Sequence, residues 1–339
     1  MGIKGLLKFL REYPDLVIKK NIEKYEGKKI AVDISIILYQ VVIAIRNSGS
    51  DLVNKKGEIT SHILGLFNKT FTLLKRKIIP IFVFDGKPPK IKASLLNNRK
   101  IYRCKAEELM LNAKTEEERI KYFKRCVNIS NTQIEQSKEL LTLMGIPYIN
   151  APGEADIQCA YMCKNNLVYG VLTEDMDILT FGSNRIIRNL SSYKKDIYEI
   201  DLKKILDKLA FTHDNFIDFC ILLGCDYCKG LSDIKANIIY KYFSYTKNIE
   251  LTIKLLRNDN YIIEDFDYKE ARKYFLDNND IDKDINNKLD LKTPDIAKLE
   301  NLLVDKYGLI KSRIQNKINF LENNFTDSLK NNDVYTLNI

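Results

Sequence analysis

The chain has 339 residues, of which 45% are hydrophobic, enough to build one large domain or two modest domains with a real core. Lys and Arg outnumber Asp and Glu by 54 to 45, and the net charge of +9 favours a polyanionic partner such as nucleic acid. No apolar run of about 18 residues occurs, so we expect no membrane-spanning helix. With no secretory signal pattern and seven dispersed cysteines, we expect an intracellular protein with reduced thiols.

Three apolar, β-branched runs are predicted to be buried strands, and each of them finishes in an acid. They are KKIAVD (28–33), IIPIFVFD (78–85) and LVYGVLTED (167–175). Helical patterns separate them, and this alternation indicates an α/β fold with a central, mainly parallel, twisted sheet flanked by helices. Parallel sheets bind ligands beyond the carboxyl ends of their strands, so we expect three acids at that edge: Asp33, Asp85 and Asp175.

The segment from Lys87 to Arg125 is rich in basic residues and has helical periodicity. A solvated, charged helix is the usual explanation of such a run. Lys92 and Arg99, however, lie two helical turns apart on one face, shortly after the second strand. We therefore expect these two cations beside the acidic edge of the sheet.

Further acids follow in INAPGEADIQCAYM and in CILLGCDYCKG. Glu154 and Asp156 open a predicted helix, where the helix dipole by itself also favours acids. Asp226 follows a buried run that ends at Gly224, and a capped turn would explain it equally well. Each of these acids alone is compatible with an ordinary structural role.

Two carboxylates stand two residues apart in VLTEDMDILTF, within an otherwise apolar run. At the end of a strand, Asp175 and Asp177 face the same edge, with Met176 between them turned towards the core. Like charges that are brought together raise each other's pKa unless cations neutralise them. The convergence of all these acids therefore predicts bound metal.

The chain becomes rich in Asn, Asp and Lys from about Asn258 to Asp295. We expect a variable surface segment with little chemistry there.

The predicted chemistry is hydrolysis of a phosphodiester. Magnesium prefers oxygen ligands, binds few protein carboxylates directly and leaves positions for water and phosphate oxygens. Two such ions roughly 4 Å apart activate a water and stabilise the leaving oxygen. Because acids alone would repel DNA, the adjacent Lys92 and Arg99 are suited to reach the scissile phosphate and stabilise its developing charge.

In order along the chain, these motifs resemble those of the flap endonucleases, the replicative branch of the structure-specific 5′ nuclease family. The match covers nearly everything from Met1 to about Gly230 and runs through MGIKGLLKFL, VDISIILYQ, TSHILGLF, FVFDGKPPKIKASLLNNR, LMGIPYINAPGEADIQCAYM, TEDMDILTFGS and FCILLGCDYCKG. The resemblance implies a PIN-like nuclease core with a helical arch and a helix-hairpin-helix-type C-terminal region.

The resemblance also divides the chain into regions. It implies an N-terminal nuclease region (1–104, with the arch starting near 90), the rest of the arch (105–135), an internal nuclease region (136–256, with a hairpin-like segment at 226–245) and a C-terminal helical region (257–339).

The implied activity is a structure-specific 5′ flap endonuclease with 5′–3′ exonuclease activity. Such an enzyme cuts DNA at the flap base by two-metal hydrolysis, in Okazaki fragment maturation during replication and in base excision repair. The resemblance implies two Mg²⁺ per chain, replaceable by Mn²⁺, a branched DNA substrate with a 5′ flap, and a monomer. It implies a location in the nucleus, and members of the family also occur in the nucleolus and the mitochondrion.

Roles for individual residues follow from the same resemblance. The residues that the resemblance implies as metal ligands, direct or through water, are Asp33, Asp85, Glu154, Asp156, Asp175, Asp177 and Asp226. Lys92 and Arg99 would activate the phosphate, and Tyr39 would stack on the base next to the cut, unless it is a helix residue that faces the core. DNA contacts fall to Gly2, Arg46, Lys69, Glu154, Gly224 and Asp226. Lys69 stands where the family usually has Arg, which turns a bidentate grip into a point-charge contact.

Two departures from the family pattern stand out. In GLSDIKANIIYKYF, Asp233 and Lys235 occupy places where the hairpin usually has glycines, which permit positive φ and close backbone approach. We expect weaker duplex binding there, and the change makes a potassium ion at the hairpin doubtful. The chain ends NNDVYTLNI, without the aromatic pair of a sliding-clamp box, so clamp binding rests on kinship alone.

Three other functions would use part of the same set of residues. A 5′ exonuclease of the same family would use the same centre, and it differs in how the arch admits a 5′ end. A non-catalytic DNA-binding scaffold would have lost acids, and none is lost. A sugar phosphatase with a D-x-D motif needs Thr where this chain has Leu179, and the basic helix would be unexplained.

Overall fold

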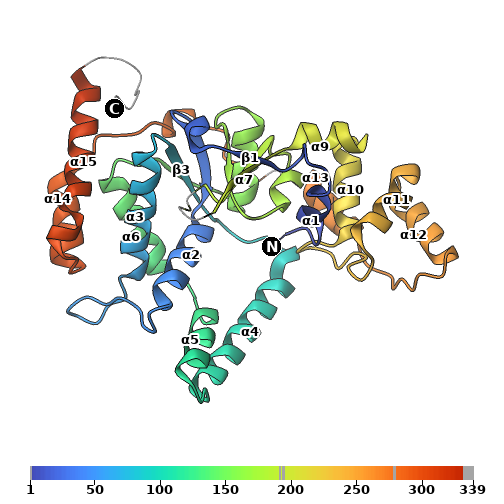
Figure 1. The fold of residues 1–339 in the computed structure, drawn as a ribbon, viewed down its shortest axis with the longest axis horizontal. Coiled ribbons are helices and arrows are strands. Elements are labelled where there is room, and N and C mark those ends of the chain that lie inside the picture. The colour runs from blue at the N-terminus through green and yellow to red at the C-terminus, as the bar shows by residue number, and fades with distance from the viewer. Residues whose placement is uncertain (1, 191, 193–194, 278–279, 331–339) are drawn as a thin grey trace. The chain divides into compact units, whose positions relative to one another are not determined.

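The computed structural model describes residues 2–190, 192, 195–277 and 280–330 (Figure 1). The chain forms two compact units. Unit 1 consists of Met1–Lys24, Asp85–Leu96 and Ala151–Lys283, and unit 2 of Tyr25–Phe84, Asn97–Asn150 and Asp284–Ile339. Each unit is thus assembled from segments that are far apart in the sequence. The predicted division into contiguous regions remains a prediction.

Residues 331–339, which lack the aromatic pair of a sliding-clamp box, lie outside the described residues. None of the helices in the described ranges is long and apolar enough to cross a membrane.

The sheet of unit 2 is parallel. Its strands are β2 (Lys29–Asp33), β3 (Ile79–Phe84) and β4 (Tyr148–Asn150), in the order β2-β3-β4. Every residue of β3 is buried, which explains its continuous apolar sequence. Asp33 therefore stands at the carboxyl end of a buried strand, as predicted, beside Val83 of the neighbouring strand.

Helices α2 (Ile34–Arg46) and α3 (Ser61–Lys75) pack on the strands of unit 2. The other helices of this unit are α5 (Glu116–Arg125), α6 (Asn131–Leu143), α14 (Ile296–Glu300) and α15 (Lys311–Lys330), with short turns η3 (Asn286–Lys288) and η4 (Asn301–Lys306). Helix α3 packs against α2, β3 and α6, and α14 packs against α6 and α15 (Figure 1). The strand-to-helix turn is stabilised by Asp33, whose carboxylate accepts a hydrogen bond from Ser35 N at 2.8 Å.

The sheet of unit 1 is mixed. Its strands β1 (Ile18–Lys20), β5 (Gly170–Leu172), β6 (Arg185–Arg188) and β7 (Ile197–Asp201) lie in the order β1-β7-β6-β5. Strands β5 and β6 are parallel, whereas β7 runs antiparallel to both of its neighbours. Residues 170–172, a short part of the predicted third run, form the strand β5, which leads to Asp175 and Asp177.

Unit 1 is otherwise helical. Its elements are α1 (Leu6–Leu10), η2 (Lys90–Lys92), α7 (Ala155–Lys164), α8 (Asp177–Thr180), α9 (Leu202–Leu209), α10 (His213–Leu223), α11 (Ala236–Thr246), α12 (Ile249–Asn258) and α13 (Lys269–Leu276), and η1 (Ile22–Tyr25) begins in it. Aromatic rings hold the hairpin helices together: Phe219 of α10 lies 5.4 Å from Phe9 of α1 and 6.1 Å from Phe243 of α11. Such aromatic pairs stabilise the packing beyond the effect of burial alone, so α10 holds the turn that follows it in a fixed position.

The predicted arch segment is helical and exposed. Helix α4 (Ala93–Leu111) buries only Ala106, and α5 buries none of its residues. Three glutamates open α5 and two basic residues close it, which suits the helix dipole. These helices therefore depend on charge and capping more than on a core of their own.

Candidate active site

The two acids that are spaced two residues apart lie in the turn between β5 and α8 of unit 1. Asp175 N donates to Thr173 Oγ1 at 3.0 Å, and Asp175 Oδ1 accepts from Asp177 N at 3.2 Å. Asp175 is 7% exposed and Asp177 is 3% exposed, and Met176 between them is buried, as predicted. Asp177 begins the short helix α8, so it is a turn, rather than a continued strand, that sets the pair side by side.

Asp177 has an electrostatic environment that calls for a cation. Burial, followed by repulsion from Asp175 and Asp226, raises the pKa of Asp177 well above its usual value, and the Lys92 charge opposes this effect. Its Oδ1 atom has no hydrogen-bond partner among the described residues. A buried carboxylate oxygen in this state is costly unless a ligand satisfies it.

Gly2 lies directly against the pair. A Cβ atom at this residue would stand 1.9 Å from Asp175 Oδ1 and 2.6 Å from Asp177 Oδ1, and φ is +74°. Both the contact and the backbone conformation require glycine. The start of the chain thus forms part of the wall of this site.

A second group of acids is organised by the end of β3 and the start of α7. Asp85 Oδ1 accepts a hydrogen bond from Ala155 N at 2.9 Å, which joins the strand end to the helix. Gly86 allows this closeness, because a Cβ there would lie 2.2 Å from the carbonyl oxygen of Ala151. The helix begins with Glu154 as its N-cap and carries Asp156 in its first turn, as predicted.

Lys92 is the cation of this group. Its ammonium forms an ion pair with Glu154 Oε1, and both side chains are largely buried. Burial would lower the pKa of Lys92, but the carboxylates of Glu154, Asp156 and Asp226 outweigh it, so the pKa is raised. Lys92 therefore stays charged in the midst of the acids.

Two tyrosines complete the surroundings of Glu154. Tyr227 and Tyr274 donate their hydroxyl hydrogen bonds to Glu154 Oε2 at 2.7 and 2.6 Å, and their rings lie 4.7 Å apart. Burial and the nearby Glu154 charge raise the pKa of both phenols, so both remain protonated donors. Lys92 Nζ lies 5.4 Å from the centre of the Tyr227 ring.

Asp226 stands in the tight turn that follows α10. The turn is closed by Cys225 N, which donates to Cys228 O at 2.8 Å. Gly224 has φ +96°, and a Cβ there would lie 2.4 Å from Lys229 O, so the turn requires glycine. Lys4 N donates to Gly224 O at 2.8 Å, which ties the start of the chain to this turn.

Further along the same hairpin, the backbone does not need the glycines that the family pattern leads one to expect. Lys235 has φ −63° and serves as the N-cap of α11, and Asp233 is not among the residues with positive φ. Their side chains are accommodated without backbone strain. The predicted weak duplex binding and the doubtful potassium ion remain predictions.

The expectation that residues 258–295 form a surface segment is wrong for α13, which buries Ala271 and Phe275. Helix α13 lies in this segment and delivers Tyr274 to Glu154, and Asp282 exchanges two hydrogen bonds, of 2.9 and 2.8 Å, with Gln158 of α7. The sequence does contain a pattern that predicts a partly buried helix here. It is the apolar pair Ala271 and Phe275, at i,i+4 spacing in EARKYFL, and both residues are buried. The polar composition around it obscured that short pattern.

The other predicted residues belong to unit 2 and are described within it. Tyr39 is 40% exposed, which argues against the alternative that it faces the core. Arg46 is buried, pairs with Asp51 at 2.9 Å and donates to Phe123 O at 2.9 Å. The remaining residues are Asp33 at the end of β2, Lys69 on α3, whose pKa is lowered by burial, and Arg99, exposed on α4.

The donor set of unit 1 suits a hard divalent cation. No three His, Cys, Asp or Glu side chains within the described ranges converge closely enough to form a complete metal site. Magnesium does not require one, because it is commonly held by one or two carboxylates and keeps several waters. The unsatisfied Asp177 Oδ1 and the neighbouring Asp175 provide such a pair of oxygen donors.

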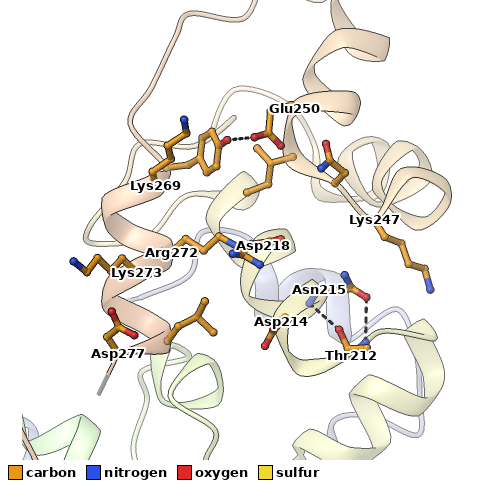
Figure 2. Close-up of a pocket in the computed structure, with 14 residues that line it drawn as sticks. Thr212, Asp214, Asn215, Asp218, Lys247, Glu250, Lys269, Arg272, Lys273 and Asp277 are labelled. Atoms are coloured by element: carbon orange, nitrogen blue, oxygen red, sulfur yellow. Dashed lines mark hydrogen bonds and ion pairs between the residues drawn. The ribbon is translucent and has the colours of Figure 1, made fainter. Parts of the chain in front are cut away.

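A separate pocket of about 770 Å³ is lined by α10, the start of α12, and α13 (Figure 2). Helix α13 contributes basic side chains and α10 acidic ones, and Arg272 of α13 turns towards Asp218 of α10, with an Nε–Oδ1 distance of 2.6 Å. None of the predicted site residues lines this pocket.

Comparison with known proteins places this geometry in a family. The XPG N-terminal domain model matches residues 1–106, and the XPG I-region model matches residues 145–226. Flap endonuclease 1-B of Physcomitrium patens is 39% identical over 94% of this chain and 94% of its own length. The chain belongs to the flap endonuclease 1 family.

Two further relatives support membership of the flap endonuclease 1 family. The solved structure of flap endonuclease-1 from Methanococcus jannaschii matches with a TM-score of 0.69 and 34% identity, over 91% of this chain and 95% of that chain. This likeness confirms the predicted α/β fold. Flap endonuclease 1 of Plasmodium falciparum is 42% identical over 95% of this chain, and the chain spans about half the length of that relative.

Proposed function

We propose that this chain is a structure-specific 5′ flap endonuclease that also acts as a 5′–3′ exonuclease, in DNA replication and base excision repair. The observation that carries the proposal is the buried pair Asp175 and Asp177, in which Asp177 Oδ1 has no hydrogen-bond partner among the described residues. A site for neutral ligands would not gather acids in this way. Membership of the flap endonuclease 1 family supplies the reaction that such a site performs.

The cofactor proposed is Mg²⁺, two ions per chain, with Mn²⁺ able to substitute. A bound pair of such ions supplies a water activated for attack and stabilises the leaving oxygen of the phosphodiester. Candidate ligands in unit 1, direct or through water, are Asp85, Glu154, Asp156, Asp175, Asp177 and Asp226, and Asp33 of unit 2 is proposed to join them.

Two basic side chains of this protein are proposed to neutralise the charge of the scissile phosphate. Lys92 is held among the acids by Glu154 and remains charged, so its ammonium can neutralise a scissile phosphate oxygen once that phosphate replaces part of its carboxylate contact. Arg99 on the exposed helix α4 is proposed to act with it. Gly2 leaves the wall beside Asp175 and Asp177 free of side-chain atoms.

The proposed substrate is branched DNA with a 5′ flap, which a chain of net charge +9 would attract. The proposed contacts to DNA are made by Tyr39, Arg46, Lys69 and Gly224, besides the site itself. We propose a monomer in the nucleus, and a sliding clamp is a partner by kinship only.

One panel of substrates tests the proposal. Double-flap, nicked and blunt duplex DNA, each labelled at a 5′ end, are incubated with the protein and Mg²⁺. Release of an intact flap oligonucleotide is the expected result. Mononucleotides from every substrate would instead establish a 5′ exonuclease, and binding without any cleavage in Mg²⁺ or Mn²⁺ would establish a scaffold.

A further inference from the structure

We propose that Tyr274, together with Tyr227, is a positioning residue that fixes the orientation of the Glu154 carboxylate for cation binding. The inference rests on the proposed function, because it treats Glu154 as a ligand. It assigns a role in the active site to α13.

The two oxygens of Glu154 have different partners. Oε2 accepts both phenol hydrogen bonds, at 2.7 and 2.6 Å, while Oε1 contacts the Lys92 ammonium. A carboxylate oxygen has two lone pairs, so two phenols saturate Oε2. Because phenols are neutral donors, they bring no positive charge to Glu154, and a cation can approach through Oε1. Glu154 is thereby oriented to bind a cation through one oxygen, and Lys92 is the competing cation that contacts Oε1 among the described residues.

The two phenols are themselves held by packing. The Phe275 ring lies 5.2 Å from Tyr227 and 5.2 Å from Phe181, and Tyr274 lies 6.1 Å from Phe181. We call these four rings (Phe181, Tyr227, Tyr274 and Phe275) the aromatic cluster. Phe181 ends the helix that starts at Asp177, and Tyr227 directly follows Asp226 in the chain. The aromatic cluster therefore joins α13 to two segments that carry acids, those of Asp177 and Asp226.

Helix α13 is also held in place by an ion pair with α10. Arg272 forms its ion pair with Asp218 of α10, and this contact lies within the pocket of Figure 2. Ala271 and Phe275 are buried on the same helix. With both sides of α13 fixed, the Tyr274 hydroxyl has little freedom to leave Glu154. Residues that orient a metal ligand in this way typically change metal affinity or activity by about 10- to 100-fold when they are mutated.

The test is Tyr274→Phe, which removes the hydroxyl and keeps the ring in the aromatic cluster. Tyr268→Phe is the matched control, because the Tyr268 hydroxyl also donates to a glutamate, Glu250, and both residues line the separate pocket, which contains none of the predicted site residues. Binding of Mn²⁺ to the DNA-free protein is measured by electron paramagnetic resonance. We expect about 10-fold weaker Mn²⁺ binding for Tyr274→Phe, and a change of less than about twofold for Tyr268→Phe.

A double-mutant cycle separates positioning from a general effect on packing. In the Glu154→Gln background, Tyr274→Phe should weaken Mn²⁺ binding no further, because the orientation of Glu154 no longer matters. The proposal is overturned by unchanged affinity in Tyr274→Phe, by an equal loss in Tyr268→Phe, or by an undiminished loss in the Glu154→Gln background. Absence of Mn²⁺ binding by the wild-type protein also overturns it. If the expected pattern of Mn²⁺ affinities occurs but no flap is cut, the proposed function fails and this inference stands.

Discussion

The substitution Gly2→Ala should abolish most cleavage while the fold is retained. The added Cβ would lie 1.9 Å from Asp175 Oδ1, whereas ordinary contacts begin near 3.4 Å, so the carboxylate must retreat by about 1.5 Å. A misplacement of about 1 Å at a reacting centre costs about 100-fold in rate. The positive φ of +74° adds a backbone cost of about 1–2 kcal/mol for any residue with a Cβ.

Gly5→Ala is a matched control for the backbone cost alone. Gly5 has φ +69°, and a Cβ there would meet no atom within 4 Å. Single-turnover cleavage of a 5′ flap substrate in Mg²⁺ should fall about 100-fold in Gly2→Ala and less than about threefold in Gly5→Ala. Urea denaturation should show similar losses of stability for both variants. Equal cleavage rates for the two variants would refute the argument that Gly2 makes room for the acids.

The remaining predictions concern Asp177 and two buried residues of unit 2, Arg46 and His62. Asp177→Asn should keep DNA binding, lose several orders of magnitude in cleavage and raise the free energy of unfolding in metal-free buffer, since it removes a buried charge; lower stability would contradict this. Arg46→Ala should lower the free energy of unfolding by about 3–5 kcal/mol in urea titrations, because it leaves the largely buried Asp51 carboxylate without its cation, and a loss below about 1 kcal/mol would leave DNA contact as the main role of Arg46. Burial lowers the pKa of His62 to about 4, against about 6.5 in the unfolded chain. The unfolded chain therefore takes up a proton first as the pH falls, and stability should decline between pH 6.5 and pH 4 by up to about 3 kcal/mol. His62→Gln should flatten that decline in urea titrations at pH 7 and pH 5, and an unchanged slope would show that other groups cause it.

The parts of the fold that were predictable are those that depend on local patterns. Buried strands such as β2 and β3 carry continuous apolar runs, and the chain must turn where they end, so Asp33 and Asp85 could be placed at strand ends. Glu154 and Asp156 could be placed at a helix start because Pro152 and Gly153 precede them. These inferences need only the period of the sequence and the chemistry of turns.

The parts that were not predictable depend on contacts between distant residues. Tyr274 meets Glu154 across 120 positions of sequence, and no local rule pairs a tyrosine in a polar segment with an acid at a helix start. The burial of Arg46 likewise depends on Phe123, which is 77 positions away. Both contacts arise from packing between elements, which the period of a sequence does not encode.

The central claim is that the acids around Asp177 are gathered to hold the cations that cleave DNA. Anomalous diffraction from crystals soaked in Mn²⁺ tests it directly, with Asp177→Asn crystals as the comparison. The account predicts a Mn²⁺ peak in contact with the Asp175 and Asp177 carboxylates in the wild-type protein, and loss or strong weakening of that peak in the variant. Normal flap cleavage at a Mn²⁺ concentration that leaves no peak at these carboxylates would contradict it.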